Sequence, residues 1–157
     1  MAKTTVTLTL PSESDTDLLG QTLARFAQPG DCILLRGHIG AGKSALARAF
    51  IRQHLGEDTE VPSPTFTLVQ VYELADVEIW HADLYRLTDT QEAVELGLTD
   101  AFDTEICLIE WPEILGDMTP ENTIDIEMVA GKDGHTATLT YGENWVSRIA
   151  EFNLNAQ

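Results

Sequence analysis

The chain has 157 residues, and its 26 Asp and Glu against 9 Lys and Arg give a formal net charge of -17 at pH 7. This length predicts a single domain over residues 1–157, and a hydrophobic content of 43% indicates a globular protein rather than a disordered acidic one. The acidity argues against strong direct binding of nucleic acid or of an anionic membrane, because their phosphates repel such a surface at long range. It does not exclude one small anionic ligand held by a local site.

The sequence predicts neither a membrane span nor a signal peptide. No stretch approaches the roughly 18 consecutive apolar residues that a membrane helix needs, and the N-terminal segment lacks the apolar centre of a signal peptide. We therefore expect a cytoplasmic protein. Cys32 and Cys107 each lie within an apolar run, which predicts reduced core thiols rather than a disulfide.

The first half of the chain alternates between predicted strands and helices. Residues 4–10 alternate in polarity as a strand does, and a helical pattern follows over residues 18–26 until a Pro-Gly pair stops it. A continuously apolar run over residues 32–37 predicts a buried strand, which leads directly into a helix over residues 43–55.

Hairpins dominate the second half of the chain. The predicted elements are, in order, an antiparallel hairpin of residues 65–74 and 77–83, a short helix over 90–97, a buried strand over 105–110, a hairpin of 123–130 and 135–141, and a closing helix over 145–152. Because two buried strands, one of them feeding a helix, stand among several hairpins, we expect a three-layer α/β fold with a mixed β-sheet.

The strongest motif is a phosphate-binding loop (P-loop) of the form G-x-x-x-x-G-K-[S/T]. Residues 37–44, GHIGAGKS, match it in full and lie between a buried strand and a helix, as the loop requires. Its glycines allow successive N–H groups to face a phosphate at the positive end of the helix. Lys43 is expected to reach the β- and γ-phosphates, and the Ser44 hydroxyl to bind Mg²⁺. The sequence thus predicts a nucleotide site in a P-loop NTPase-like domain.

Such a site needs an acid at the end of a neighbouring strand. Glu110 ends the strand at 105–110, and Asp83 ends the strand at 77–83. One would hold Mg²⁺ while the other orients the attacking water, and the sequence does not assign these two roles; either residue is alternatively a solvated acid. His81 shares a strand face with Asp83, and a structural and a functional histidine are equally compatible with that position.

Three further residues are candidates on weaker grounds. Thr65 follows Lys43 by about 20 residues, where P-loop GTPases place a switch threonine, although a plain rigid turn fits the Pro-Ser-Pro-Thr segment as well. Trp111 directly follows Glu110 and is compatible with core packing, ligand stacking or partner contact. Arg86 is the cation best placed to face the site.

Missing motifs narrow the class of P-loop protein. The guanine-binding Asn-Lys-x-Asp string is absent, and no Lys or Arg occurs between Arg86 and Lys132 to form the basic lid of a kinase. These features favour a minimal ATPase that drives a conformational step in a partner. A small-molecule kinase and an ATP-sensing binding module without significant hydrolysis are the alternatives.

The motifs GHIGAGKS, SPTFTLVQVYEL, HADLYRL, ELGLTDAF and CLIEWPEIL occur in one order across roughly residues 30–115. In this combination the chain closely resembles the bacterial TsaE (YjeE) family, the small ATPases of tRNA threonylcarbamoyladenosine biosynthesis. The resemblance implies an ATPase that uses ATP and Mg²⁺ and works with the TsaD–TsaB complex, which transfers threonylcarbamoyl to adenosine 37 of tRNA. In that family hydrolysis supports multiple turnover, by resetting the complex.

The resemblance also implies roles for individual residues. Ser44 and Glu110 would hold Mg²⁺, and Lys43, Thr65, Asp83 and Glu110 would form the catalytic set. The nucleotide would be bound by Glu13, Gly37, His38, Ile39, Gly40, Ala41, Gly42, Lys43, Ser44, Ala45, Trp111 and Gly134. His38 stands where the family often has an acid, and Ser44 stands where threonine is commoner; both hydroxyls can bind Mg²⁺.

Overall fold

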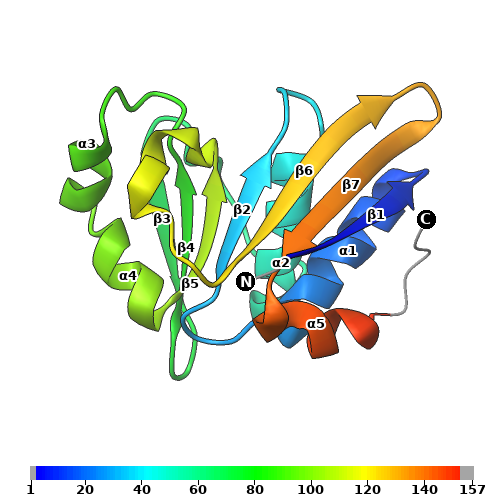
Figure 1. The fold of residues 1–157 in the computed structure, drawn as a ribbon, viewed down its shortest axis with the longest axis horizontal. Helices are drawn as coiled ribbons and strands as arrows, with labels where there is room; N and C mark the ends of the chain where they lie inside the picture. The colour runs from blue at the N-terminus through cyan, green and yellow to red at the C-terminus, as the bar shows by residue number, and fades with distance from the viewer. Residues whose placement is uncertain (1–2, 153–157) are drawn as a thin grey trace.

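The computed structural model describes residues 3–152, which form a seven-stranded sheet with helices on both faces (Figure 1). The strands are β1 (Thr4–Leu10), β2 (Cys32–Arg36), β3 (Val69–Glu73), β4 (Glu78–Asp83), β5 (Ile106–Glu110), β6 (Thr123–Gly131) and β7 (Gly134–Tyr141). Their order is β1-β7-β6-β2-β5-β4-β3. The four central strands from β6 to β4 are parallel, and the outer pairs are antiparallel, so the predicted mixed sheet is confirmed.

Two helical layers enclose the central strands and confirm the α/β fold class. The helices are α1 (Glu13–Phe26), α2 (Lys43–Leu55), α3 (Thr90–Glu95), α4 (Leu98–Thr104), the 3-10 helix η1 (Pro112–Met118) and α5 (Glu143–Ala150). Residues of α1, α2 and α5 pack in one hydrophobic cluster, and residues of α3, α4 and η1 in another, on the opposite face of the sheet. The side chains of β2 and β5 alternate between the two clusters, which explains why both strands are apolar throughout.

The main differences from the sequence prediction are at three places. The first strand of the 65–83 hairpin starts at Val69, because Leu68 has a left-handed backbone with φ of +72° and its amide bonds the Pro64 carbonyl in a turn. Helix α4 was missed, although Leu98, Ala101 and Phe102 have helical spacing and are buried. The closing helix spans Glu143–Ala150 rather than 145–152, since it begins directly after Gly142.

The sheet brings three strand ends to one edge. Strands β2, β5 and β4 are parallel neighbours, so their carboxyl ends meet there, with Leu35 opposite Glu110 and Glu110 opposite Asp83. Ligands of open α/β sheets bind outside the carboxyl ends of the strands. The register therefore sets two acids side by side where the chain leaves β2 for α2. Within residues 3–152, no helix has the length and the apolar character needed to cross a bilayer.

The two cysteines are free and buried, as predicted. Cys32 of β2 lies opposite Cys107 of β5, and both side chains belong to the cluster under α3 and α4. Burial raises the pKa of the Cys107 thiol to about 12, and it raises that of Cys32 as well. Both thiols therefore stay protonated to a higher pH than a free cysteine does.

We predict that alkylating reagents modify neither thiol in the native protein and both after unfolding in urea.

The stabilisation that comes from neutral, buried Cys107 is fully present below pH 9.0. It is lost as the pH rises toward about 12, because the thiol of the unfolded chain ionises first. Urea unfolding between pH 8 and pH 11 measures this as a falling free energy of unfolding. A Cys107→Ala variant should show a shallower fall, and equal slopes would contradict the prediction.

Candidate functional site

The glycine-rich loop connects β2 to α2 at the edge where the strand ends meet. Gly37 has a φ of +138°, and a side-chain Cβ there would come within 2.4 Å of the Met128 carbonyl oxygen of β6. Only glycine allows the chain to leave β2 this close to β6. Helix α2 begins at Lys43, so its first amides, which have no partner within the helix, face the loop. Such an arrangement attracts an anion.

The Lys43 side chain is held inside the loop. Its Nζ donates to the Gly37 carbonyl oxygen at 2.6 Å and lies 3.7 Å from the centroid of the Trp111 ring. Burial lowers the pKa of Lys43, although the carboxylates of Glu110 and Asp83 act in the opposite direction. The ring of Tyr85 packs against Trp111 at 4.8 Å. The Lys43 ammonium thus contacts the Trp111 ring and the Gly37 carbonyl, and it interacts electrostatically with the acids that end β4 and β5.

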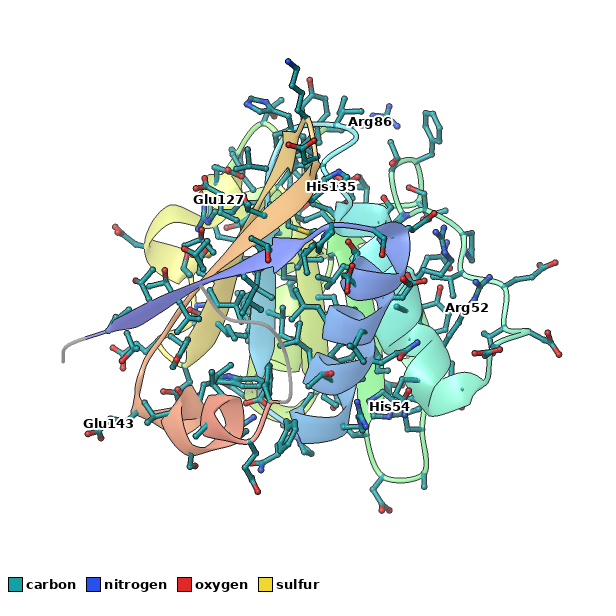
Figure 2. The ribbon with its side chains drawn as sticks, turned by 90° about the vertical axis from the view of Figure 1, so that its right-hand side faces the viewer. Arg52, His54, Arg86, Glu127, His135 and Glu143 are labelled. Carbon is teal, nitrogen blue, oxygen red and sulfur yellow. The ribbon has the colours of Figure 1, made fainter. Side chains whose placement is uncertain are left out.

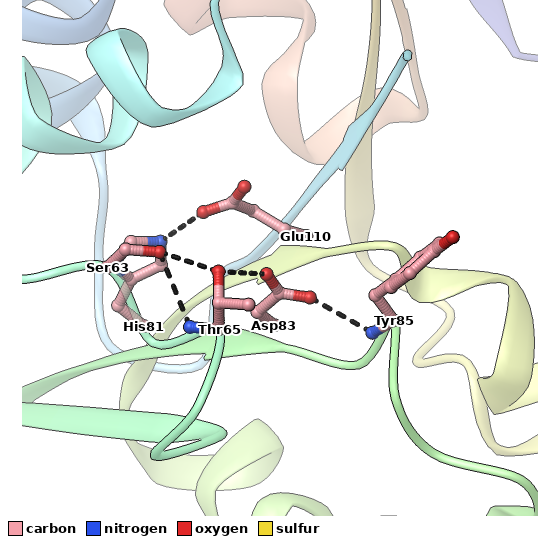
Figure 3. A network of polar contacts seen from close by, with 6 residues as sticks. All are labelled: Ser63, Thr65, His81, Asp83, Tyr85 and Glu110. Atoms are coloured by element: carbon pink, nitrogen blue, oxygen red, sulfur yellow. Dashed lines mark hydrogen bonds and ion pairs between the residues drawn. The ribbon is translucent and has the colours of Figure 1, made fainter. Parts of the chain in front are cut away.

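Asp83 and Glu110 end β4 and β5 in register, and both are buried. Asp83 accepts two hydrogen bonds, one from the Thr65 hydroxyl at 3.2 Å and one from the Tyr85 amide at 3.0 Å (Figure 3). Glu110 makes a different contact, because its Oε2 lies 2.6 Å from Nε2 of His81. The two acids are therefore equivalent in position but not in their partners.

Residues 62–68 form a turn over the end of β4. The hydroxyls of Ser63 and Thr65 lie 2.8 Å apart, and Thr65 in turn donates to Asp83. The Asp83 amide donates to the Leu68 carbonyl at 2.9 Å, which joins the other end of the turn to the same strand. Leu68 and Trp111 are the two non-glycine residues with positive φ in the described part of the chain, and both flank this site. Such strained backbone is concentrated at functional sites.

A cavity of about 460 Å³ opens between these elements. It is lined by residues of the loop, of α2, of the 62–68 turn and of both strand ends: Ile39, Gly40, Gly42, Lys43, Ser44, Ala45, Thr65, Asp83, Tyr85, Glu110 and Trp111. The structure thus brings together every catalytic and metal-binding candidate taken from the sequence. Tyr85 is an addition: it lies in the turn after β4, where its amide donates to Asp83, and strand alternation gives no signal for it.

A second cavity of about 350 Å³ lies on the other side of the loop and shares Gly40, Gly42 and Ala45 with the first. Its remaining lining comes from the start of α1 and from the β6–β7 turn: Pro11, Ser12, Glu13, Thr16, Gly134 and His135. Gly134 has a φ of +114°, and a Cβ there would lie 2.7 Å from the Leu10 carbonyl oxygen. This close packing brings the β6–β7 turn against Leu10 and Pro11, so that Gly134 and Glu13 line one cavity.

Several residues fall outside the expected arrangement. His38 is exposed and lines neither cavity. Arg86 is exposed as well (Figure 2) and lines neither cavity, and its guanidinium lies 5.4 Å from the ring of Phe66. His135, which sequence analysis did not single out, has Nε2 3.3 Å from the Gly40 carbonyl oxygen. No spacing rule connects residues 95 positions apart, so only the fold reveals this contact.

The oxygen atoms around the first cavity suit a hard cation. Residues 3–152 contain no cluster of three or more His, Cys, Asp or Glu side chains arranged to hold a metal by themselves. The cavity does bring the hydroxyl of Ser44 together with the carboxylates of Asp83 and Glu110. Mg²⁺ prefers oxygen ligands and commonly combines one or two carboxylates with phosphate and water, so this set fits it.

Comparison with known proteins agrees with this geometry. Residues 10–138 match the family model described as threonylcarbamoyl adenosine biosynthesis protein TsaE. The chain belongs to the TsaE family. Relatives named tRNA threonylcarbamoyladenosine biosynthesis protein TsaE include those of Haemophilus influenzae and Bacillus subtilis. The first is 45% identical over 75% of this chain and 77% of its own; the second is 33% identical over 87% and 86%.

The fold is shared with a solved structure. A crystal structure of YdiB from Bacillus subtilis superposes with a TM-score of 0.78 at 25% identity, covering 96% of this chain and 95% of the other. The TsaE relative of Rickettsia conorii is 40% identical over 78% of this chain and 70% of its own. The resemblance seen in the motifs is therefore confirmed over most of the chain, and the P-loop NTPase-like fold with it.

The bond between Thr65 and Asp83 should hold the 62–68 turn in place. We predict that Thr65→Val removes about 1 kcal/mol of local stability, so that amides of the turn exchange with deuterium about five-fold faster. Thr67→Val is the matched control, because the Thr67 hydroxyl accepts from Gln70 and does not contact Asp83. Hydrogen exchange followed by mass spectrometry measures both. Equal exchange of residues 62–68 in the two variants would show that Asp83 does not anchor the turn.

Proposed function

We propose that this TsaE-family protein is a Mg²⁺-dependent ATPase that acts with the TsaD–TsaB complex in tRNA threonylcarbamoyladenosine biosynthesis in the cytoplasm. The observation that supports the proposal most is the first cavity, in which Lys43 and the start of α2 face two buried carboxylates and a serine hydroxyl. A phosphate group there would meet backbone N–H donors and an ammonium on one side, and acids able to hold a metal and a water on the other.

The two cavities suggest how ATP would lie across the loop. The phosphates would occupy the first cavity, where Lys43 would exchange its bond to the Gly37 carbonyl for phosphate oxygens. The nucleoside would occupy the second cavity, between Glu13 and Gly134, as the family resemblance implies for these two residues. Trp111, packed against Lys43 and Tyr85, would cover one side of the phosphates. The shared wall of Gly40, Gly42 and Ala45 makes the two subsites continuous.

The different partners of the two acids suggest different tasks. Both oxygens of Asp83 accept hydrogen bonds, from Thr65 and from the Tyr85 amide, so Asp83 is suited to hold Thr65 and a water beside the terminal phosphate. Glu110 engages one oxygen with His81 and is suited to hold Mg²⁺ with the Ser44 hydroxyl through the other. Mg²⁺ bound there would withdraw charge from the β- and γ-phosphate oxygens.

Hydrolysis measured with and without the purified TsaD–TsaB pair and tRNA tests the proposal. We expect slow release of phosphate by the free protein and a clear stimulation by the pair. Lys43→Ala and Glu110→Gln should each lower the stimulated rate by about 10²–10³-fold, since the first removes an ammonium that stabilises transition-state charge and the second weakens binding of the Mg²⁺ that does the same. Lys132→Ala is the matched control, because this exposed lysine in the β6–β7 turn lines neither cavity.

Each alternative has its own signature in that experiment. Equal rates with and without the pair would contradict the partner-driven part of the proposal. Transfer of the γ-phosphate to a metabolite instead of water would establish a small-molecule kinase. Nucleotide-dependent complex formation, with no hydrolysis above the uncatalysed rate in a single turnover, would establish an ATP-sensing module.

The charge of -17 leads to a second prediction about partners. We expect the free protein to show no sub-micromolar binding of tRNA at physiological salt, because its surface repels the phosphate backbone beyond the short range of Lys43. Fluorescence anisotropy of labelled tRNA measures this, with the TsaD–TsaB pair as the positive comparison. Tight binding by the free protein would show that local basic groups overcome the net charge.

A further inference from the structure

A buried histidine lies directly behind the acid that ends β5. His81 is in β4 and is 2% exposed, and its Nε2 is 2.6 Å from Oε2 of Glu110, which is 4% exposed. In the parallel pairing His81 stands opposite Leu108, two residues before Glu110 on the same face of β5. The imidazole therefore reaches forward, toward the carboxyl end of the sheet, to meet the carboxylate (Figure 3).

The hydrogen on this ring can be assigned from its partners. An ionised carboxylate only accepts, so at 2.6 Å the hydrogen is on Nε2 and His81 donates to Glu110. Nδ1 is buried and has no hydrogen-bond partner among the residues that the structure describes. The Nε2–H of His81 is therefore directed at Glu110.

This donor leaves the acid with one engaged and one available oxygen. Oε1 of Glu110 has no hydrogen-bond partner within residues 3–152 and lies on the side away from His81 (Figure 3), and Glu110 lines the cavity that also holds Lys43 and Ser44. Asp83 does not compete for the histidine, because Thr65 and Tyr85 occupy both of its oxygens. The contact thus restricts the rotation of one particular carboxylate.

A purely structural role accounts poorly for a polar ring at this place. Ile79, two residues earlier on the same strand face, fills the equivalent position with a fully buried apolar side chain. A buried imidazole with one nitrogen unpartnered has less to contribute to packing than such a residue. Its single hydrogen bond is directed at a cavity-lining acid, as in the outer-shell contacts that orient metal-binding carboxylates.

We propose that His81 is a positioning residue that holds Glu110 in the rotamer that offers its free oxygen to Mg²⁺ in the Mg²⁺·ATP complex. The inference rests on the proposed function, because it assigns His81 to the metal-binding half of that site. It predicts that loss of the Nε2–H donor impairs use of Mg²⁺ rather than binding of the nucleotide itself.

Two substitutions of His81 separate positioning from packing. His81→Leu fills the space without a donor, whereas the amide nitrogen of His81→Gln can replace the Nε2–H. In the presence of TsaD–TsaB we expect His81→Leu to lower kcat by about 10- to 100-fold and to raise the Mg²⁺ concentration for half-maximal rate, with little change in KM for ATP. His81→Gln should recover most of the rate. His54→Leu, far from both cavities on α2, is the control.

The outcomes decide the proposal in each case. Wild-type kcat and Mg²⁺ dependence in His81→Leu, or equal impairment of folded His81→Gln and His81→Leu, would overturn it. Should the variants fail to fold, nitrogen NMR of the wild-type histidine rings still tests the proposal, because a hydrogen on Nδ1 of His81 instead of Nε2 would overturn it as well.

Should the wild type not hydrolyse ATP, the proposed function fails separately. The Mg²⁺ concentration needed for the half-maximal rise in affinity for a non-hydrolysable ATP analogue then tests His81, and it should increase in His81→Leu and stay near the wild-type value in His81→Gln.

Discussion

The parallel pairing of β2 with β5, and of β5 with β4, is the constraint on which the site depends. It places Glu110 between Leu35, the last buried residue before the phosphate-binding loop, and Asp83. A shift of one residue in either pairing would turn an acid to the opposite face of the sheet, among the side chains under α3 and α4. The apolar cores on both faces therefore fix the position of the polar groups at the strand ends.

Around this register, the two acids acquire separate surroundings from different parts of the chain. Asp83 joins the 62–68 turn to β4 through the hydroxyl of Thr65, while Glu110 joins β5 to β4 through the imidazole of His81. Both oxygens of Asp83 accept hydrogen bonds, whereas only one oxygen of Glu110 is engaged, so the two neighbouring carboxylates are suited to different tasks. The same principle, in which environment divides the tasks of paired acids, operates in many hydrolytic sites.

The net charge and the site act over different distances. At long range the charge of -17 repels polyanions, and screening by salt limits this repulsion to about 8–10 Å from the surface. At short range the amides at the start of α2 and the Lys43 ammonium act inside a cavity where screening is weak. An acidic protein can thus have a site for phosphate groups without a surface for nucleic acid. This supports a division of work in which partner proteins hold the tRNA.

The sequence by itself determined the features that depend on neighbouring residues. The loop at 37–44, the buried strands before it and before Glu110, and the antiparallel β6–β7 hairpin follow from local spacing and apolar patterning, and they were found with errors of a few residues. The family resemblance was available for the same reason, since its motifs are short and contiguous. Two predictions were wrong. The strand that starts at Val69 was predicted too long because Leu68 has a left-handed backbone, and helix α4 was missed because it depends on packing against the sheet.

Only the tertiary structure decided which distant residues meet. Strand order and register bring Thr65 to Asp83 and His81 to Glu110, and they leave the other nitrogen of His81 without a partner among residues 3–152. They also pack Gly134 against Leu10 and Pro11, just before α1. Strand alternation had placed His81 and Asp83 on one face but left the purpose of the histidine open. The pairing of β4 with β5 identifies Glu110 as its partner, because hydrogen bonds between strands bring together residues that no local spacing relates.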